Sequence, residues 1–238
     1  TVDLLRLGVM DTEAALAHHQ RIAETIGADP SRLAGWEHHL EMSCDPDLAL
    51  DTLADLSQRS PQLVVGLLDD NDSACRLVRL LGASSELGRH LVAHPDDLAE
   101  IAHDPVRRSR DEIRNDLLEV VGAHEDGEFL VAERPTGPAA DRLRLANRRH
   151  LVRIASRDVG ADDPTEVVED IAGELADLAD AVVAAALALT RADCPDHADA
   201  RLAVVAMGKC GAQELNYISD VDVVHVAEPA REDVSAAR

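Results

Sequence analysis

Apolar residues recur every three or four positions along most of the chain, which is the spacing of amphipathic helices. Proline, serine or aspartate precedes many of these segments, as is common at helix N-termini. The pattern predicts a series of short helices followed by two long ones. The expected ranges are 14–26, 30–41, a helix from 46 that includes 56, 61–68, 73–81, 85–93, a short helix from 95, 110–121, 139–159 and 164–191.

Single residues mark several of these helix ends. Asp11 is expected to cap the first helix and Gly27 to end it, and Asp72 is expected to cap the fifth. Trp36 is expected on the inner face of the second helix. Because the chain does not begin with methionine, we expect a piece of a longer protein, with residues 1–10 frayed or left from an upstream segment.

The helical pattern breaks between residues 122 and 139. This stretch contains three glycines and two prolines among mixed charges, which is typical of a loop. We therefore expect a linker at 123–138. It would separate a helical region, 1–122, from a second domain, 139–238.

A strand-turn-strand pattern follows the two long helices. The apolar run 202–207 is too short for a helix and rich in β-branched residues, so it predicts a buried strand. Two glycines follow this run, and the polar segment 212–219 behind them predicts a short helix. A second apolar run, 220–227, is headed by two aspartates and predicts a second strand.

Asp220 and Asp222 are the centre of the expected site. Residues two apart on a strand project to the same face, and a rise of about 3.3 Å per residue separates them by about 6.6 Å. Two charges at that distance repel by about 2.5 kcal/mol at an effective dielectric constant near 20. A cation between the carboxylates would remove this cost, and paired carboxylates suit Mg²⁺. By itself, an Asp-x-Asp sequence is also typical of a solvated strand end.

The glycine turn before the aspartates favours phosphate binding. Gly208 and Gly211 have no side chain that would keep a phosphate from the backbone N–H groups. A helix opened by the turn would add its positive N-terminal end. Lys209, the only lysine of the chain, would contact a phosphate or simply be exposed. Ser219 would bond a phosphate or cap a turn.

Composition excludes several classes of function. The formal net charge of −23 argues against binding to nucleic acids or anionic membranes, because both need clustered Lys and Arg. The longest apolar run, 181–189, is too short to span a membrane. The four cysteines share no metal-ligand spacing and indicate reduced thiols in a cytoplasmic protein. The eleven histidines are dispersed, and we interpret them as structural or surface residues.

An arginine ridge follows the first long helix. Arg142, Arg149, Arg153 and Arg157 fall within an arc of about 80°. In so acidic a protein, this ridge would bind phosphate or the acidic surface of a partner. The alternative is an ion-paired scaffold with the acidic helix 164–180, and the two interpretations are compatible.

These parts together resemble the nucleotidyltransferases of the DNA polymerase β type, which carry a glycine turn and then, after a short spacer, Asp-x-Asp. The string from Met207 to Asp222, Met-Gly-Lys-Cys-Gly-Ala-Gln-Glu-Leu-Asn-Tyr-Ile-Ser-Asp-Val-Asp, is similar to the signature of the glutamine synthetase adenylyltransferase/adenylyl-removing enzyme family. Its Glu-Leu-Asn variant resembles the N-terminal, adenylyl-removing half of that family. Ala206, Cys210 and Ala212 depart from the signature without touching the acidic pair.

The resemblance implies a fold, a reaction and partners. The fold would be mostly α: an N-terminal helical array followed by the start of an α/β (α+β) nucleotidyltransferase domain with a short β-sheet. The reaction would transfer AMP from the adenylylated tyrosine of glutamine synthetase to phosphate, giving ADP, with Mg²⁺ or Mn²⁺ held by Asp220 and Asp222. A second centre of the family adenylylates with ATP, and a PII-type signal protein is a further expected partner. Weaker blocks at 80–98 and 143–158 resemble the same family.

A third catalytic carboxylate has no candidate within the expected domain. Enzymes of this fold take it from a later strand, whereas Glu232 and Asp233 lie in a polar tail. We therefore expect the chain alone to be inactive. Two alternatives stay open: a non-catalytic helical module for regulation or docking, and a different nucleotidyltransferase such as a uridylyltransferase.

Overall fold

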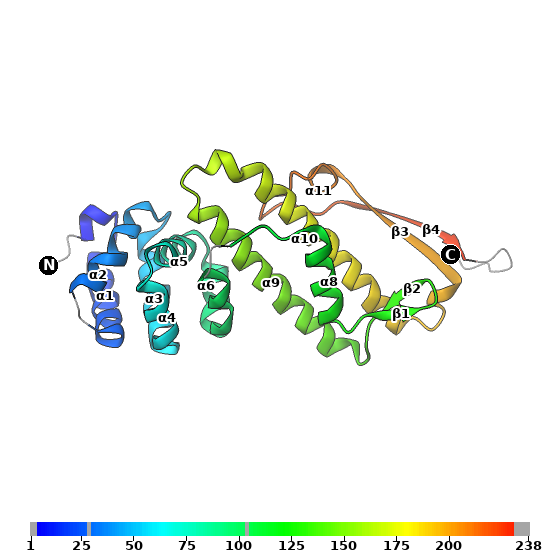
Figure 1. Ribbon diagram of the computed structural model, residues 1–238, viewed down its shortest axis with the longest axis horizontal. Coiled ribbons are helices and arrows are strands. Elements are labelled where there is room, and N and C mark those ends of the chain that lie inside the picture. The colour runs from blue at the N-terminus through cyan, green and yellow to red at the C-terminus, as the bar shows by residue number, and fades with distance from the viewer. Residues whose placement is uncertain (1–3, 28–29, 103–104, 231–238) are drawn as a thin grey trace. The chain divides into compact units, whose positions relative to one another are not determined.

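Helices predominate in the structure, a computed structural model (Figure 1). Two small two-stranded antiparallel sheets accompany them in the described part of the chain. These features confirm the expectation of a mostly helical chain with a short β-sheet. The structure describes residues 4–27, 30–102 and 105–230, with residues 4, 5 and 30–33 described by their backbone alone.

The chain forms two compact units. The first consists of residues 1–106 and 151–164, and the second of residues 107–150 and 165–238. This division differs from the linker expected at 123–138, because that expectation followed composition along the chain and not contacts in space.

The first unit is a helical array. Its 3-10 helices are η1 (Leu4–Leu7), η2 (His38–Met42) and η3 (Pro95–Leu98). Its α-helices are α1 (Thr12–Ile26), α2 (Pro30–Glu37), α3 (Pro46–Arg59), α4 (Pro61–Leu68), α5 (Asn71–Ala83), α6 (Ser85–Ala93) and α7 (Ala99–Ala102). The predicted helix 30–41 therefore ends as an α-helix at Glu37 and continues as a 3-10 helix.

Side-chain caps account for several of these helix starts. Asp11 accepts an N–H group of the first turn of α1 at 3.0 Å, and Gly27 follows the last residue of that helix, as expected. The cap of α5 is Asp70, which accepts the N–H of Ser73 at 2.9 Å. The expectation of Asp72 as this cap is wrong, because the helix begins earlier and Asp72 lies within its first turn.

The core of the first unit is apolar, and α3 packs there against α1, α5 and α6. Trp36 is fully buried, which confirms its expected inward position. The same core includes Leu40, Leu53 and Leu77, which are also buried. Burying side chains of this size stabilises a fold by about 1.5–3 kcal/mol each. Tertiary packing, more than helix propensity, therefore stabilises these short helices.

The second unit combines helices with both sheets. Its elements are α8 (Arg110–Val120), β1 (His124–Asp126), β2 (Phe129–Val131), α9 (Thr136–Gly160, up to residue 150), α10 (Pro164–Asp193, from residue 165), η4 (His197–Asp199), β3 (Ala200–Ala206), α11 (Gly208–Gly211) and β4 (Val223–Pro229). The two long helices confirm the predictions at 139–159 and 164–191, with somewhat longer bounds.

A β-hairpin occupies part of the segment that was expected to be a loop. Asp126 of β1 pairs with Phe129 of β2 across a two-residue turn, in which Gly127 has a φ of +63°. Just beyond β2, the N–H of Ala132 donates to the carbonyl of Ala188 on α10 at 3.0 Å. A two-residue loop that begins with glycine is a hairpin signal, but β1 is polar and both strands have three residues, too few to show a period of two.

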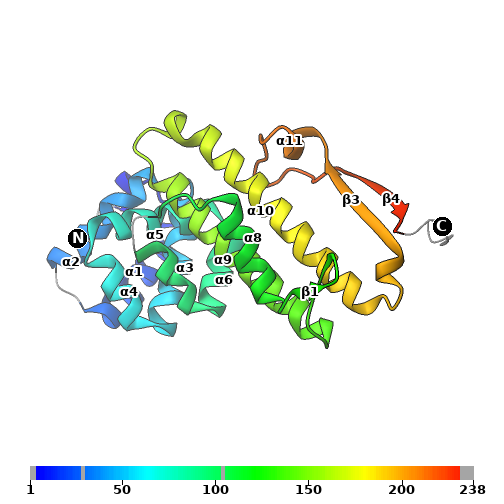
Figure 2. The ribbon, with the colours of Figure 1, turned by 45° about the vertical axis from the view of Figure 1, so that its right-hand side comes forward.

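The antiparallel pair β3–β4 carries the glycine turn at one end (Figure 2). Its last pair is Ala206 with Val223, and both of these residues face a cavity beside α10. Val205, Val224 and Val226 are exposed on the opposite face. The alternation of half-buried and exposed residues along β3 corrects the prediction of a buried strand, because α10 covers only one face of this pair. Among the described residues, no helix combines the length and apolarity that crossing a bilayer requires.

Candidate functional site

The glycine turn joins β3 to the one-turn helix α11. Gly208 has a φ of +53°, a backbone conformation that residues with a side chain rarely adopt. A Cβ on Gly211 would lie 2.5 Å from the carbonyl oxygen of Ala206, so only glycine fits there without movement of the backbone. The prediction of a helix at 212–219 is wrong: α11 lies on the glycines themselves, and Gln213, with a φ of +61°, is incompatible with its continuation. Within the described ranges, the N–H groups of Gly208, Lys209 and Cys210 have no partner, whereas that of Gly211 donates to the carbonyl of Met207 at 3.0 Å. The turn can therefore bind a phosphate through three N–H groups, but a one-turn helix adds little dipole.

The two aspartates lie just before β4. The expectation that they lie on the strand is therefore wrong. The ladder ends at the pair of Ala206 and Val223, because β3 turns away at that point into the glycine turn. Asp220 and Asp222 are both exposed. Within the described parts of the chain, neither carboxylate has a hydrogen-bond or ion-pair partner.

Asp222 lies directly against the glycine turn. Its Oδ2 atom is 3.5 Å from the position that a Cβ would take on Gly208. Its carbonyl accepts the N–H of Met207 at 2.9 Å. The fold therefore brings one predicted carboxylate beside the predicted phosphate-binding backbone, although the two are fourteen residues apart in the sequence.

The other residues predicted for this site surround the turn. Lys209 is exposed, and its ammonium has no polar partner among the residues that the structure describes. The hydroxyl of Ser219 donates to Oδ1 of Asn216 at 2.7 Å, and the N–H of Ser219 donates to the carbonyl of Asn216. In this structure Ser219 thus closes a local turn.

The donor set at this site is small. In the described ranges, no group of three His, Cys, Asp or Glu side chains is arranged to hold a metal ion. Glu232 and Asp233 lie outside the described residues. The two exposed carboxylates suit Mg²⁺ when substrate phosphates complete its coordination. The residues present therefore fit a divalent cation that binds together with a phosphate.

A cavity of about 330 Å³ lies on the α10-facing side of the β3–β4 pair. Ala206 and Val223 line it from the sheet, and Arg110 and Arg114 of α8 line its polar side. Although Asp222 precedes Val223 in the chain, its side chain does not line this cavity. The acidic pair is thus open to solvent at the end of the sheet.

The four arginines of the expected ridge lie along α9. Arg142 donates to a backbone carbonyl of α8 at 3.0 Å, and Arg149 pairs with Asp116 of α8 at 3.2 Å. In the first unit, Arg153 is 5% exposed and donates to a backbone carbonyl at 2.8 Å. Arg157 is half-buried. For Arg142, Arg149 and Arg153, these contacts show a structural role within their own unit.

Asp116 is the centre of a polar contact inside the second unit. Its Oδ2 lies 2.7 Å from Nε2 of His150, which is 2% exposed. Burial would raise the pKa of the Asp116 carboxyl, but the hydrogen bond and charge of His150, together with the charge of Arg149, lower it below its ordinary value. The ionised carboxylate is therefore the favoured form when the chain is folded.

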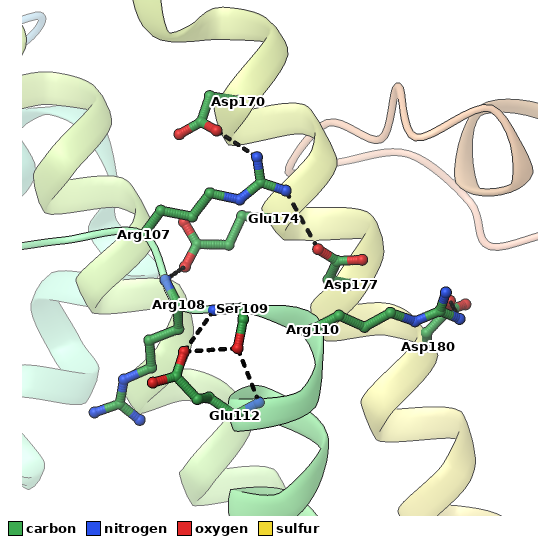
Figure 3. A network of polar contacts seen from close by, with 9 residues as sticks. All are labelled: Arg107, Arg108, Ser109, Arg110, Glu112, Asp170, Glu174, Asp177 and Asp180. Carbon is green, nitrogen blue, oxygen red and sulfur yellow. Dashed lines mark hydrogen bonds and ion pairs between the residues drawn. The ribbon is translucent and has the colours of Figure 1, made fainter.

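The acidic face of α10 pairs with arginines that the sequence analysis passed over (Figure 3). Arg107 binds Asp170 and lies 3.3 Å from Asp177, and Arg110 binds Asp180 at 2.6 Å. Burial raises the pKa of Asp177 and the bond to Arg107 opposes that rise. These pairs join the N-terminus of α8 to the middle of α10.

Two further contacts hold the same segment. Glu174 of α10 is fully buried and accepts the backbone N–H of Arg108 at 3.1 Å. Ser109 and Glu112 form a reciprocal capping box at the start of α8. A Ser-x-x-Glu sequence directly after two arginines was the available signal, but it could not identify partners more than sixty residues away.

The chain is similar to known proteins along its whole length. A family model described as glutamate-ammonia ligase adenylyltransferase matches residues 74–238. A bifunctional glutamine synthetase adenylyltransferase/adenylyl-removing enzyme from Cutibacterium acnes is 77% identical over 237 residues, which are 100% of this chain and 24% of the relative. No solved structure matches the chain significantly.

More distant relatives carry the same name. The one from Streptomyces coelicolor is 40% identical over 240 residues, covering 95% of this chain and 21% of the relative. One from Bifidobacterium longum is 36% identical over 241 residues, covering 98% of this chain and 22% of the relative. The chain thus spans about a quarter of the length of the curated relatives it matches. These matches confirm the resemblance carried by the string 207–222.

Proposed function

Because the chain belongs to the glutamate-ammonia ligase adenylyltransferase family, we propose that it forms part of an adenylyl-removing centre. This centre transfers AMP from the adenylylated tyrosine of glutamine synthetase to phosphate and releases ADP. The alternative within the family is the centre that adenylylates with ATP, and the Glu-Leu-Asn sequence of residues 214–216 favours the removing one.

The observation that carries this proposal is the contact between Asp222 and the turn at Gly208. A carboxylate and free backbone N–H groups meet at one exposed point of the fold. The first can bind a divalent cation and the second can bind phosphate oxygens. Together they form the two kinds of contact that phosphoryl and nucleotidyl transfer require.

The roles of the residues follow from the reaction. An oxygen of the attacking phosphate forms a bond to the phosphorus of the tyrosyl-AMP, while the bond from that phosphorus to the tyrosyl oxygen breaks. The tyrosyl oxygen keeps the electron pair and takes up a proton. The backbone N–H groups of Gly208, Lys209 and Cys210 and the ammonium of Lys209 would orient the phosphates, whereas the N–H of Gly211 already donates to the carbonyl of Met207.

Asp220 and Asp222 would hold Mg²⁺ or Mn²⁺ at this point. When bound, such an ion neutralises charge on the phosphates and on the leaving oxygen. A two-stranded sheet with one exposed apolar face is marginal by itself. We therefore propose that the 238-residue chain needs further parts of the relatives' length to act, and that the helical unit docks glutamine synthetase or a PII-type protein.

A chimera tests the assignment. The stretch of the Cutibacterium acnes relative that this chain matches is replaced by this chain. Asp220→Asn with Asp222→Asn is expected to slow phosphate-dependent release of AMP as ADP by at least about a hundredfold. Adenylylation with ATP should persist. The matched control is Asp196→Asn, because Asp196 is exposed and its side chain makes no cap hydrogen bond.

The other outcomes separate the alternatives. Loss of adenylylation alone would assign the chain to the ATP-dependent centre, and retention of both activities would favour a non-catalytic docking or regulatory module. Release of a uridine nucleotide from a uridylylated substrate would indicate a uridylyltransferase. The unfused chain should form no ADP, and ADP formed at the rate of the chimera would contradict its proposed dependence on other segments.

A further inference from the structure

A second cavity, of about 740 Å³, lies within the first unit and far along the sequence from the acidic pair. It is bounded by η2, by the first half of α5 and by the C-terminal end of α9. Its walls include His39, Cys75, Arg76, Arg79 and Gly160. The cavity is open to solvent on the side of Met42 and Asp162, and only its inner wall, with His39 and Arg76, is buried. A buried polar wall of this kind needs explanation, because polar groups without partners are costly to bury.

His39 is the most enclosed polar group of this cavity. His39 is 5% exposed, and the Nε2 atom of its ring has no hydrogen-bond partner among the described residues. Burial, the neighbouring His38 and the charge of Arg79 lower the pKa of His39, while contacts with Asn71 oppose this. The neutral ring can donate a hydrogen bond from Nε2 to a group inside the cavity.

Two arginines lie beside His39 in fixed positions. Arg79 donates from Nη1 to the carbonyl of Val159 at 3.0 Å, and its buried Nε has no partner within the described ranges. Arg76 is 8% exposed and donates twice to the carbonyl of Ile101 at 3.1 Å. Gly160 leaves room for Arg76, since a Cβ there would be 2.8 Å from the Cγ of that arginine.

Three carboxylates also line the cavity. Hydrogen bonds from Ser73, and less strongly the charge of Arg76, lower the pKa of Asp70, so Asp70 partly neutralises Arg76. Asp70 accepts the N–H of Ser73 as the cap of α5, and Asp72 accepts a bond from Asn71. Asp162 is exposed. Burial raises the pKa of the Cys75 thiol. The charges of Arg79 and Arg76 lower that pKa, and each has a larger effect on it than the charge of Asp72 or Asp162. The lining as a whole carries three carboxylates and two guanidinium groups, so a binding site for an anion is confined to the part beside Arg79 and His39.

We propose that this cavity binds a small anion through the guanidinium group of Arg79 and Nε2 of His39. Carboxylate and phosphate oxygens share the required chemistry, because both accept charge-assisted hydrogen bonds from a guanidinium group. The ligand is a small molecule, since the cavity lies within one helical unit and its deepest donors are buried. The site is independent of the acidic pair and of the proposed nucleotidyl transfer.

Titration of the 238-residue chain tests this site. Long-range ¹H–¹⁵N spectra of the histidine rings are recorded with increasing inorganic phosphate in one arm and succinate in the other, and His39→Gln identifies the His39 signal. We expect a saturable shift of that signal in at least one arm, and the active arm defines the anion. The bound anion should also raise the pKa of His39.

Arg79→Gln should weaken the binding by at least about tenfold, since a hydrogen bond to a charged group is lost. Arg89→Gln is the matched control, because Arg89 is exposed on α6 and, among the described residues, bonds only to Ser85 of its own helix. If Arg79→Gln loses its helical circular dichroism, His39→Gln replaces it in calorimetric titration with the active anion. No saturable shift in either arm, or equal weakening by Arg89→Gln, would overturn the proposal.

Discussion

Replacing Gly211 by alanine tests whether the glycine turn is fixed by packing. The added Cβ would lie 2.5 Å from the carbonyl oxygen of Ala206, below the 3.0 Å that real Cβ contacts essentially respect. That oxygen belongs to the backbone of β3 and cannot rotate away, so the end of the strand or α11 must shift by about half an ångström. Forced packing of this kind costs about 1–3 kcal/mol.

The expected loss is measurable in a chain of this size. At about 2–4 °C per kcal/mol for 150–250 residues, a cost of about 2 kcal/mol lowers the melting temperature by roughly 4–8 °C. Thermal unfolding is followed by circular dichroism. The Met207 N–H, which donates to the carbonyl of Asp222, is followed by hydrogen exchange because it reports directly on the turn.

Gly137→Ala is the matched control for this experiment. Gly137 lies in the first turn of α9, and a Cβ there would meet nothing within 4 Å. Alanine in a helix is favoured over glycine by about 0.5–1 kcal/mol, so this variant should melt slightly higher. The reasoning is refuted if Gly211→Ala melts like the control and its Met207 amide exchanges as slowly as in the parent chain.

Two further predictions concern the second unit. Asp116→Asn removes the carboxylate that binds His150 and Arg149 and should cost about 1.5–3 kcal/mol at pH 7. Because the folded-state pKa of Asp116 lies below its ordinary 3.8, the stability that Asp116 contributes is fully present above that pH and is lost as pH falls further. The free energies of unfolding of the parent chain and the variant, measured in urea, should therefore converge toward pH 2. A difference that persists at pH 2 would contradict this account. Ser109→Ala removes the capping box with Glu112 and should cost about 1 kcal/mol in the same unfolding measurement, whereas Ser109→Asp should restore most of it.

Local interactions explain why so much of the helical fold could be predicted. The repeat of apolar positions and the caps act over three or four residues, so Asp11, Gly27 and the inward Trp36 could be placed from the sequence. The errors arose where helix starts compete locally. Asp70 and Asp72 both suit a cap, and only the hydrogen bond to Ser73 decides between them.

The candidate site divides in the same way. The glycines and the paired aspartates were evident as residue types at a given spacing. The assumption that the pair lies on a strand was wrong, because a strand needs a partner, and β3 has already ended opposite Val223. The proximity of Asp222 to Gly208 depends on how the strands pair and on the backbone of the turn, neither of which the spacing contains.

The sequence by itself determined the helices, their apolar faces and the family to which the chain belongs, because these depend on neighbouring residues and on one contiguous string. Only the tertiary structure decided that Arg107 and Arg110 meet the acids of α10, and that His39 and Arg79 share a cavity. These residues are distant in sequence, and their being polar does not indicate which partners they will have. Packing of the apolar faces brings them together, so their partners follow from the whole fold and not from any local pattern.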